Sequence, residues 1–510
     1  MEEEKKPGTI TYIDGGKFKN VEDEKEQSSL LNPKFIEAKS SIPAKKRPTL
    51  RVAAPQIIAA MGFGFMVGSV AAICIIPTLV IGALYKNKNN TENFELSEAQ
   101  VSWYGSLSYL VQPIASICSG FTQNIFGRRK MMLSATIPLF ASWIFLHFAN
   151  NVVSLYATQI IFGLSIGFME APSMSYLGEA LQPRFRGTLS SLSEFLYIVG
   201  TIYLYVCGSV LDWRTVSICG AILPCITFSI ILMLPESPTW YIVKGRVGEA
   251  EKALRWLRGW VTTEEVDEEM RLLTEAVTEN PFSGAKIIEG EFSKVKDTPS
   301  QIALFKERRI WKPVLLVCIF FFAGNSGSLI GMRPMFIDIF EELHLPVPPK
   351  LVLVISSAMN GLGCIVCVLL VHKTGKRFIS ITSLVLCAIT CGALAAYVGI
   401  GISFPWLATV LFTLNFFSAG VGILTMPWAL VSECFPLEAR GLSAGICAAG
   451  AYLSYFFFTK TYFFFEHLIS LTGVFILYGA ISLAGGLYLY AFMPETEGKT
   501  LEEIEEAYQK

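Results

Sequence analysis

The chain has 510 residues, of which 52% are hydrophobic and only 16% are charged. Soluble proteins average about 25% charged residues, and here the charges gather at the ends and in one central stretch, which excludes an ordinary soluble domain. The net charge is −1 and no basic stripe with interleaved aromatic residues is present, so nucleic acid is not expected as a partner.

The first segment, residues 1–51, is polar and is predicted to be a disordered cytoplasmic tail. It contains no apolar core of the kind found in a cleavable signal peptide. The first spanning helix is therefore expected to act as the targeting signal.

Apolar runs follow in two groups of six, separated by one polar gap. A bilayer core of about 30 Å needs about 20 predominantly apolar residues per helix, and the runs have about that length. They cover 55–84, 101–123, 131–149, 152–178, 188–210 and 214–234, then 311–336, 351–371, 378–400, 406–432, 442–465 and 470–492. We expect an all-α membrane protein of twelve transmembrane helices, with six-helix halves at 52–236 and 311–493, a linker at 237–310 and a C-terminal tail at 494–510.

The polar gap between the halves carries its own helical pattern. Apolar residues recur at helical spacing from Glu249 to Trp260 and from Glu264 to Ala276, with charges between them. This pattern predicts short amphipathic helices. We interpret them as a cytoplasmic bundle that braces the two halves, with a solvated linker as the alternative.

Basic residues mark one side of the membrane. They follow the even-numbered runs as Arg128-Arg129-Lys130, Arg184 with Arg186, Lys373 with Lys376-Arg377, and Arg440. By the positive-inside rule, both termini and the linker are cytoplasmic, and we expect a multi-pass protein of the plasma membrane. The first odd-numbered loop carries Asn89-Asn90-Thr91, so Asn89 is a candidate N-glycosylation site on the outer side.

The two halves repeat the same motifs at the ends of their helices. An acid and an arginine seven residues apart close the fourth and tenth runs, as Glu179 with Arg186 and Glu433 with Arg440. Gly127-Arg128-Arg129 after the second run is repeated as Gly375-Lys376-Arg377 after the eighth, and Pro235-Glu236 after the sixth as Pro494-Glu495 after the twelfth. A parallel repeat of two six-helix halves is typical of major facilitator transporters.

These paired motifs resemble the sugar porter family of the major facilitator superfamily, from about residue 52 to 506. Within that family the chain is most similar to insect facilitated trehalose transporters. The residues that carry this similarity are Trp103-Tyr104-Gly105-Ser106-Leu107, Phe458-Thr459-Lys460-Thr461 and the segment 494–502.

The resemblance implies a gating network of salt bridges at the cytoplasmic helix ends, which holds the halves together when the outside is open. Its members are Arg128, Arg129, Glu179, Arg186, Glu236, Glu433, Arg440 and Glu495. Each exposed pair contributes little alone, but a network can bias a two-state equilibrium. The alternative is that the basic residues only anchor the helix ends on the cytoplasmic side, which leaves the acidic residues of the set unexplained.

Sugar sites need amide and hydroxyl side chains and an aromatic face. The resemblance implies that Asn360 of the eighth run binds sugar and that Trp428 of the tenth is its aromatic platform. Asn325 and Ser326 of the seventh run are further candidates, with Ser326 standing where the family has asparagine. Since Asn325 is the neighbouring residue, its side chain is expected to point about 100° away around the helix.

Other family positions have changed. Phe320 and Phe321 stand where the family has two glutamines, and Leu424 replaces a family glycine. In the fourth run, Gln159 stands where the family has an arginine. A pocket that exchanges two amides for two aromatic rings is expected to favour a less polar solute or to bind sugar weakly.

Two acids inside apolar runs are functional candidates, because a carboxylate within a membrane helix is costly. Glu194 stands at a family glutamine position, and Glu170 lies in the fourth run. Glu194 has several open roles: accepting sugar hydroxyls, binding a cation, carrying a proton, or a structural carboxyl. Val70 stands where proton-driven relatives carry aspartate, so proton coupling rests on these two acids. Lys460 within the eleventh run has no counter-ion that the sequence identifies.

We therefore expect facilitative transport of a sugar, trehalose or a hexose, by alternating access. The alternatives are a proton- or cation-linked porter of a non-sugar solute that uses Glu194 and Glu170, and a non-transporting nutrient sensor. No phosphate-binding GxxxxGK[ST] loop, nucleophile–base set or metal spacing is present, and the twelve cysteines lie mostly in apolar runs. We expect no enzyme activity, no cofactor and no metal. The expected partners are a small solute and the lipid bilayer, with a monomer favoured.

Overall fold

The structure is a computed structural model that describes residues 10–14, 17–21, 49–86, 94–279, 285–288, 291–294, 305, 307–402, 404–435, 440–499 and 501–509. Some positions within these ranges are described for their backbone only, among them Arg186, Glu194 and Arg440. Asn89, the candidate glycosylation site, lies outside the described residues.

The first half consists of long helices that follow one another closely. They are α3 (Thr49–Leu84), α4 (Glu98–Phe126), α5 (Arg128–His147), α6 (Val152–Ala180), α7 (Pro183–Val210) and α8 (Trp213–Met233). Two of them begin at capping boxes, in which Ser97 and Asn151 accept a hydrogen bond from a backbone N–H of the first turn. These helices pack as the pairs α4 with α6, α5 with α6 and α5 with α8.

The second half is less regular. It consists of α13 (Arg308–Gly327), a 3₁₀ segment η2 (Ile330–Met335), α14 (Phe336–Glu342), α15 (Pro349–Thr374), α16 (Lys376–Ile400), α17 (Pro405–Val421), α18 (Met426–Glu433) and α19 (Arg440–Phe492). Leu329, at φ +54, separates α13 from η2, and Ser470, at φ +64, breaks α19 into two helical segments. Among the described residues, joining α13 to α14 and α17 to α18 and dividing α19 at Ser470 gives six spanning segments.

The predicted all-α membrane fold in two six-helix halves is confirmed, and the helix bounds lie close to the predicted runs. In the described part of the chain, eight helices are long and apolar enough to cross a membrane. One of these, Leu442–Phe492, holds both segments of α19. The helices α4 and α5 are more polar and do not qualify on composition, whereas the fully described part of α7, Phe195–Val210, is apolar but shorter; in α4 the buried residues include Ser106, Ser119 and Gln112.

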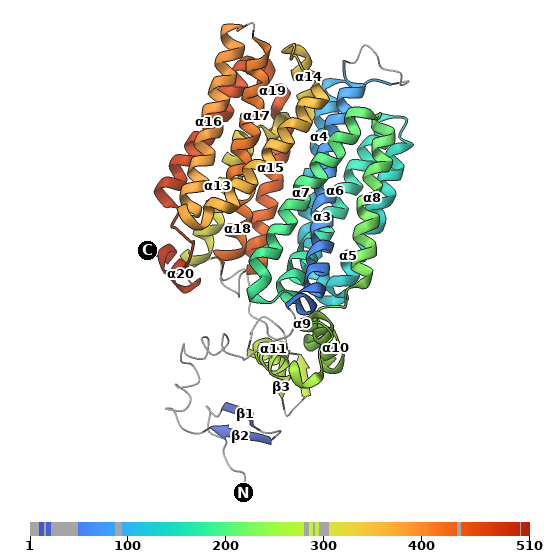
Figure 1. Ribbon diagram of the computed structural model, residues 1–510, viewed down its shortest axis with the longest axis vertical. Coiled ribbons are helices and arrows are strands. Elements are labelled where there is room, and N and C mark those ends of the chain that lie inside the picture. Colours follow the sequence, from blue (N-terminus) through green and yellow to red (C-terminus); the bar gives the residue numbers. More distant parts are fainter. Residues whose placement is uncertain are drawn as a thin grey trace. The chain divides into compact units, whose positions relative to one another are not determined.

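Small helices follow each half. After α8 the chain forms α9 (Pro238–Val243), α10 (Val247–Leu257), η1 (Thr263–Glu265) and α11 (Asp267–Glu279), and the chain ends in α20 (Leu501–Gln509). Two antiparallel hairpins were not expected from the sequence: β3 (Ala285–Ile288) with β4 (Glu291–Lys294) after α11, and β1 (Ile10–Asp14) with β2 (Lys17–Val21) in the N-terminal tail. We refer to the end of the bundle that carries α9–α11 as the linker end and to the opposite end as the distal end (Figure 1).

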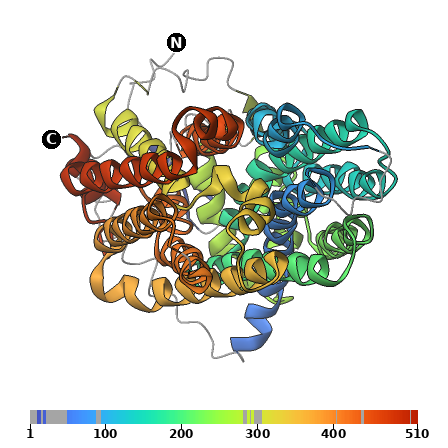
Figure 2. The ribbon, with the colours of Figure 1, turned by 90° about the horizontal axis from the view of Figure 1, so that it is seen from above.

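The two halves lie side by side (Figure 2) and contact each other along α4 with α19 and α7 with α15. Toward the distal end, Thr78 Oγ1 donates to the backbone oxygen of Arg333 at 3.0 Å, and Ser102 Oγ donates to that of Lys460 at 2.9 Å. Glu98 pairs with His467 at 2.9 Å. Since α3 ends and α4 begins there, these contacts close the distal end of the seam between the halves.

Candidate functional site

A small cavity of about 20 Å³ lies in the seam, with room for about one water molecule. Residues of both halves line it. They are Ile75 of α3, Tyr197, Thr201 and Tyr205 of α7, Arg333 of η2, Ser357 and Asn360 of α15, Phe416 of α17 and Leu424. This seam cavity therefore contains Asn360, the predicted sugar-binding amide, and Leu424, which fills a family glycine position.

The polar groups of the seam cavity are only partly satisfied. Asn360 Nδ2 donates to the backbone oxygen of Phe416 at 2.9 Å. Arg333 Nε and Ser357 Oγ are buried without a hydrogen-bond partner among the described residues. An unpaired buried polar group costs about 1–3 kcal/mol, so both groups favour a bound polar molecule.

Trp428 belongs to an aromatic cluster that crosses the seam. Its ring lies 4.9 Å from that of Phe321 and 6.4 Å from that of Tyr452, and Tyr109 of the first half lies 5.3 Å from Tyr455. Phe321 is one of the two rings that replace family glutamines, so this change enlarges the aromatic surface beside Trp428. Trp428 itself does not line the seam cavity in this state.

Glu170 joins this aromatic cluster from the first half. The hydroxyl of Tyr452 donates to Glu170 Oε1 at 2.8 Å, so a hydrogen bond links α6 to α19 across the seam. Ser116 of α4 lies beside the carboxyl group. Within the described part of the chain, Glu170 Oε2 is buried without a partner.

Asn325 and Ser326 lie away from the seam cavity. Asn325 Nδ2 donates to Ser454 Oγ at 2.5 Å, and Ser326 Oγ donates to the backbone oxygen of Tyr478 at 3.0 Å. Both side chains therefore join α13 to α19 inside the second half. The structure does not bring them together with Asn360 in this state.

Glu194 lies on α7, the helix that contributes three residues to the cavity. The backbone places it three residues before Tyr197, on the same face of the helix as Tyr197 and Thr201. Its side chain is outside the described set, so its role as a ligand or proton carrier stays a prediction.

The predicted network at the linker end contains ion pairs within each half. Arg128 pairs with Glu179 at 3.1 Å, and both side chains are largely buried. At the repeat position in the second half, Lys376 pairs with Glu433 at 2.5 Å and with Glu497 at 3.0 Å. The repeat read from the sequence thus corresponds to a repeated contact between two helix ends.

Glu236 and Glu495 have a second, equally symmetric role. Glu236 accepts from the backbone N–H of Arg129 at 2.9 Å, and Glu495 accepts from that of Lys376 at 2.9 Å. Each acid therefore caps the N-terminus of a spanning helix, α5 or α16, where the helix dipole favours a negative charge. The glycine before each helix, at φ +99 or +83, leaves room for the carboxylate.

Among the residues whose side chains are described, Arg129 forms no ion pair, and its guanidinium donates to the backbone oxygens of Ile231 and Leu232 at 3.2 and 2.7 Å. Arg186 and Arg440 would have to link the two halves, and their side chains are outside the described set. The gating role of the network across the seam therefore stays a prediction.

Lys460 has an aromatic partner. Its ammonium nitrogen lies 4.0 Å from the centroid of the Trp103 ring, in a cation–π contact between α19 and α4. Gly105 packs against Thr459 in the same place. Two of the three segments that carry the similarity to trehalose transporters therefore contact each other across the seam.

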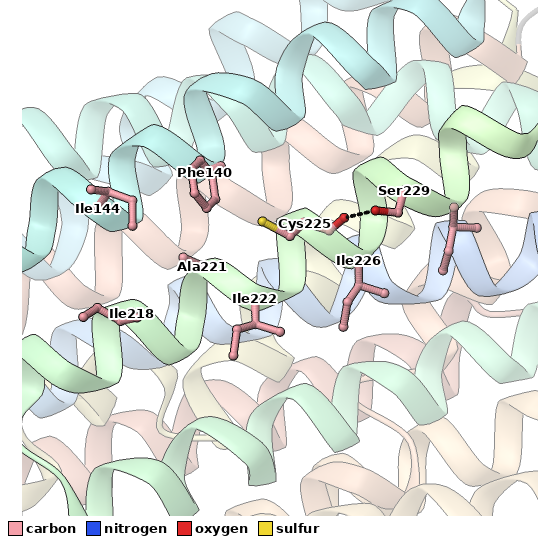
Figure 3. Close-up of a pocket in the computed structure, with 9 residues that line it drawn as sticks. Phe140, Ile144, Ile218, Ala221, Ile222, Cys225, Ile226 and Ser229 are labelled. Carbon is pink, nitrogen blue, oxygen red and sulfur yellow. Dashed lines mark hydrogen bonds between the residues drawn. The ribbon is translucent and has the colours of Figure 1, made fainter.

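A larger cavity lies elsewhere, on the outer face of the first half. About 500 Å³ in volume, it is lined by side chains of α5 and α8, including Phe140, Ile144, Ile218 and Ile222 (Figure 3). Phe140 and Ile222 are exposed, and the hydroxyl of Ser229 donates to the backbone oxygen of Cys225. An apolar groove of this kind suits lipid chains and not a sugar.

Comparison with known proteins identifies the family. The profile of the family described as "Sugar (and other) transporter" matches residues 52–508. The chain belongs to this sugar transporter family. It is a family of transporters, not of enzymes, and the chain is accordingly a transmembrane transporter of the major facilitator superfamily.

Curated relatives in the sugar transporter family include the facilitated trehalose transporter Tret1 of Apis mellifera ligustica, 26% identical over 96% of this chain and 93% of the relative. Tret1 of Bombyx mori is 28% identical over 81% of this chain and 79% of the relative. Among solved structures, the xylose transporter XylE of E. coli in a partially occluded inward-open conformation matches with a TM-score of 0.69, at 19% identity over 88% of this chain and 100% of that one. The similarity to the xylose transporter supports the fold of the sugar transporter family for this chain.

Several site residues were missed from the sequence. Lys376 and Glu497 form ion pairs that the repeat with Arg128 could have indicated. Arg333 lies inside the predicted run 311–336, where an ionisable residue is itself a signal for a functional role. No sequence signal distinguishes Ser357 or Tyr452 from other hydroxyl residues in apolar runs.

Proposed function

We propose that this protein carries a sugar, with trehalose or a hexose as first candidates, across the plasma membrane by facilitative alternating access. The observation that supports it is the seam cavity, because residues of both halves line it and a movement of one half against the other opens or closes it. The polar side chains at this cavity, Asn360, Ser357 and Thr201, are of the kinds that bind hydroxyl groups.

The positions of the contacts suggest how access alternates. In this state the distal end is closed by contacts such as Glu98 with His467, whereas the ion pairs at the linker end lie within each half. With the linker and both termini in the cytoplasm, this is a state closed toward the outside. In the opposite state, we propose that Glu179, Glu433, Arg186 and Arg440 join the halves at the linker end.

The direct test is uptake of radiolabelled trehalose and glucose by liposomes that contain the purified protein. We expect saturable uptake without an ion gradient, and a higher KM or no uptake in the Asn360→Ala variant. Ser326→Ala is the matched control, because Ser326 bonds to Tyr478 and not into the seam cavity. No saturable flux of either saccharide would refute trehalose and glucose as substrates.

A proton-linked porter is the second candidate, and Glu170 is the observation that favours it. A buried carboxyl group with one unpaired oxygen, hydrogen-bonded across the seam, can couple its protonation to the contact between the halves. This alternative predicts uptake that changes with pH, and loss of that dependence in Glu170→Gln or Glu194→Gln. Equal flux across pH 5.5–8 in the unmodified protein would contradict it.

A further inference from the structure

Arg333 is the least expected residue of the seam cavity. It follows α13 in the short segment η2, between the two halves, and its guanidinium carbon lies 5.4 Å from the centre of the Phe416 ring. Its backbone oxygen is held by Thr78 of the first half. The segment η2 and the aromatic ring thus fix a positive charge beside Asn360.

This positive charge has no acidic partner among the described residues. Arg333 forms no ion pair there, and the titratable groups that its charge reaches are Cys74 and Tyr205. Asp338, on the following helix, interacts with Glu341 and Lys86 instead. Glu194 lies one turn before Tyr197 on α7, and its side chain is outside the described set.

A guanidinium group buried in a membrane protein without a partner is costly. Arg333 Nε and Ser357 Oγ are both buried, unpaired and at the wall of the same cavity. A neutral sugar can satisfy hydrogen bonds here but leaves the charge uncompensated. A carboxylate compensates it and can accept two parallel hydrogen bonds from the guanidinium.

We propose that the seam cavity, once a movement of the halves has widened it, takes a solute with one carboxylate and several hydroxyl groups, a sugar acid, with Arg333 holding the carboxylate and Ser357 and Asn360 binding hydroxyls. One fixed positive charge matches one carboxylate. Phe416, Tyr197 and Tyr205 supply aromatic faces for the carbon skeleton. This inference rests on the proposed function, in that the seam cavity is the place where the transported solute binds.

The test is calorimetric titration of the full-length protein in detergent with D-gluconate, D-glucose and acetate at constant ionic strength. We expect gluconate to bind at least about 10-fold more tightly than glucose or acetate. In Arg333→Gln, gluconate affinity is expected to fall at least about 30-fold, which is the usual effect of removing one partner of a buried charge pair. Arg333→Lys keeps the charge but loses the paired geometry, so an intermediate loss is expected.

Arg271→Gln is the matched control. Arg271 lies on α11 and pairs there with Glu268 and Glu275, so gluconate affinity should not change. If Arg333→Gln does not fold, the comparison of gluconate with glucose in the unmodified protein and in Arg333→Lys still decides the question. Glucose affinity equal to that of gluconate, or gluconate affinity unchanged in Arg333→Lys, would overturn the proposal, and so would acetate binding as tightly as gluconate.

Liposome uptake separates this proposal from the function on which it rests. Saturable glucose uptake that gluconate does not inhibit overturns the sugar-acid proposal and leaves sugar transport intact. Arg333-dependent binding of gluconate without flux of any solute supports the binding site and contradicts transport. Saturable uptake of gluconate that Arg333→Lys weakens supports both.

Discussion

The hydrogen bond between Tyr452 and Glu170 provides a direct way to shift the balance between access states. It joins α19 to α6 across the seam at 2.8 Å. Changing Tyr452 to phenylalanine removes the hydroxyl and keeps the ring, which also contacts Trp428 and Tyr455. Glu170 then loses its hydrogen bond across the seam and keeps only Ser116 of its own half beside its carboxyl group.

The expected magnitude follows from the kind of bond. Removing one partner of a buried hydrogen bond costs about 1–3 kcal/mol, because the other partner is left unsatisfied. Because the bond forms only where the halves meet, its loss should destabilise the state closed at the distal end. A change of about 1–3 kcal/mol shifts that equilibrium by about 5- to 150-fold.

The assay is a double electron–electron resonance measurement between non-cysteine spin labels at Val153 on α6 and Glu341 on α14, both exposed. Tyr452→Phe should add a population with a longer distance at the distal end. Tyr488→Phe, in the second segment of α19 and packed beside Phe492, serves as the control and should leave the distribution unchanged. An unaltered distribution in Tyr452→Phe, or the same shift in the control, would refute the role of this hydrogen bond.

Three further predictions concern single residues and the contacts that they make. Gly375→Ala places a Cβ against Glu495 Oε2 at a backbone φ of +83, so we expect the free energy of unfolding to fall by about 2 kcal/mol, measured by thermal unfolding. Gly392→Ala, with open space around it, should not lower it. Burial raises the pKa of Glu497, but hydrogen bonds from His372 and Lys376 lower it more, so its pKa lies below the ordinary value. The contribution of Glu497 to stability is therefore present above about pH 4.3 and is lost as the pH falls through the lowered pKa. The difference in melting temperature between the unmodified protein and Glu497→Gln should accordingly shrink on acidification. A difference that grows would contradict this prediction. Lys460→Met removes the cation–π contact with Trp103, worth about 0.5–2 kcal/mol. It should lower the melting temperature of the unmodified protein more than that of the Trp103→Leu variant, which already lacks the contact. Equal losses in the two proteins would show that the contact contributes nothing.

The fold was largely predictable because the bilayer imposes a length on every apolar helix. The paired motifs also had a physical counterpart, since Arg128 with Glu179 and Lys376 with Glu433 are equivalent contacts in the two halves. The break at Ser470 marks the boundary between the two last predicted runs, but without a glycine or proline its geometry could not be read from the sequence.

The candidate site was predicted only in part. Asn360 lines the seam cavity, and its role in binding sugar stays a prediction, whereas Asn325 and Ser326 turn toward α19. Arg333 was missed because it lies beyond the regular part of α13, in a segment that begins at the left-handed residue Leu329. Its path depends on packing against the other half, and helical periodicity does not extend to such a segment.

Transport through the seam cavity is the central claim, and exchange across liposomes tests it most directly. Liposomes that contain the protein are loaded with unlabelled trehalose, glucose or gluconate, and entry of the same labelled solute is followed at pH 6 and pH 7.5. Alternating access predicts that the internal solute accelerates entry of at least one labelled solute, and that Asn360→Ala weakens this exchange. Entry no faster than in protein-free liposomes for all three solutes, or acceleration unchanged in Asn360→Ala, would contradict it.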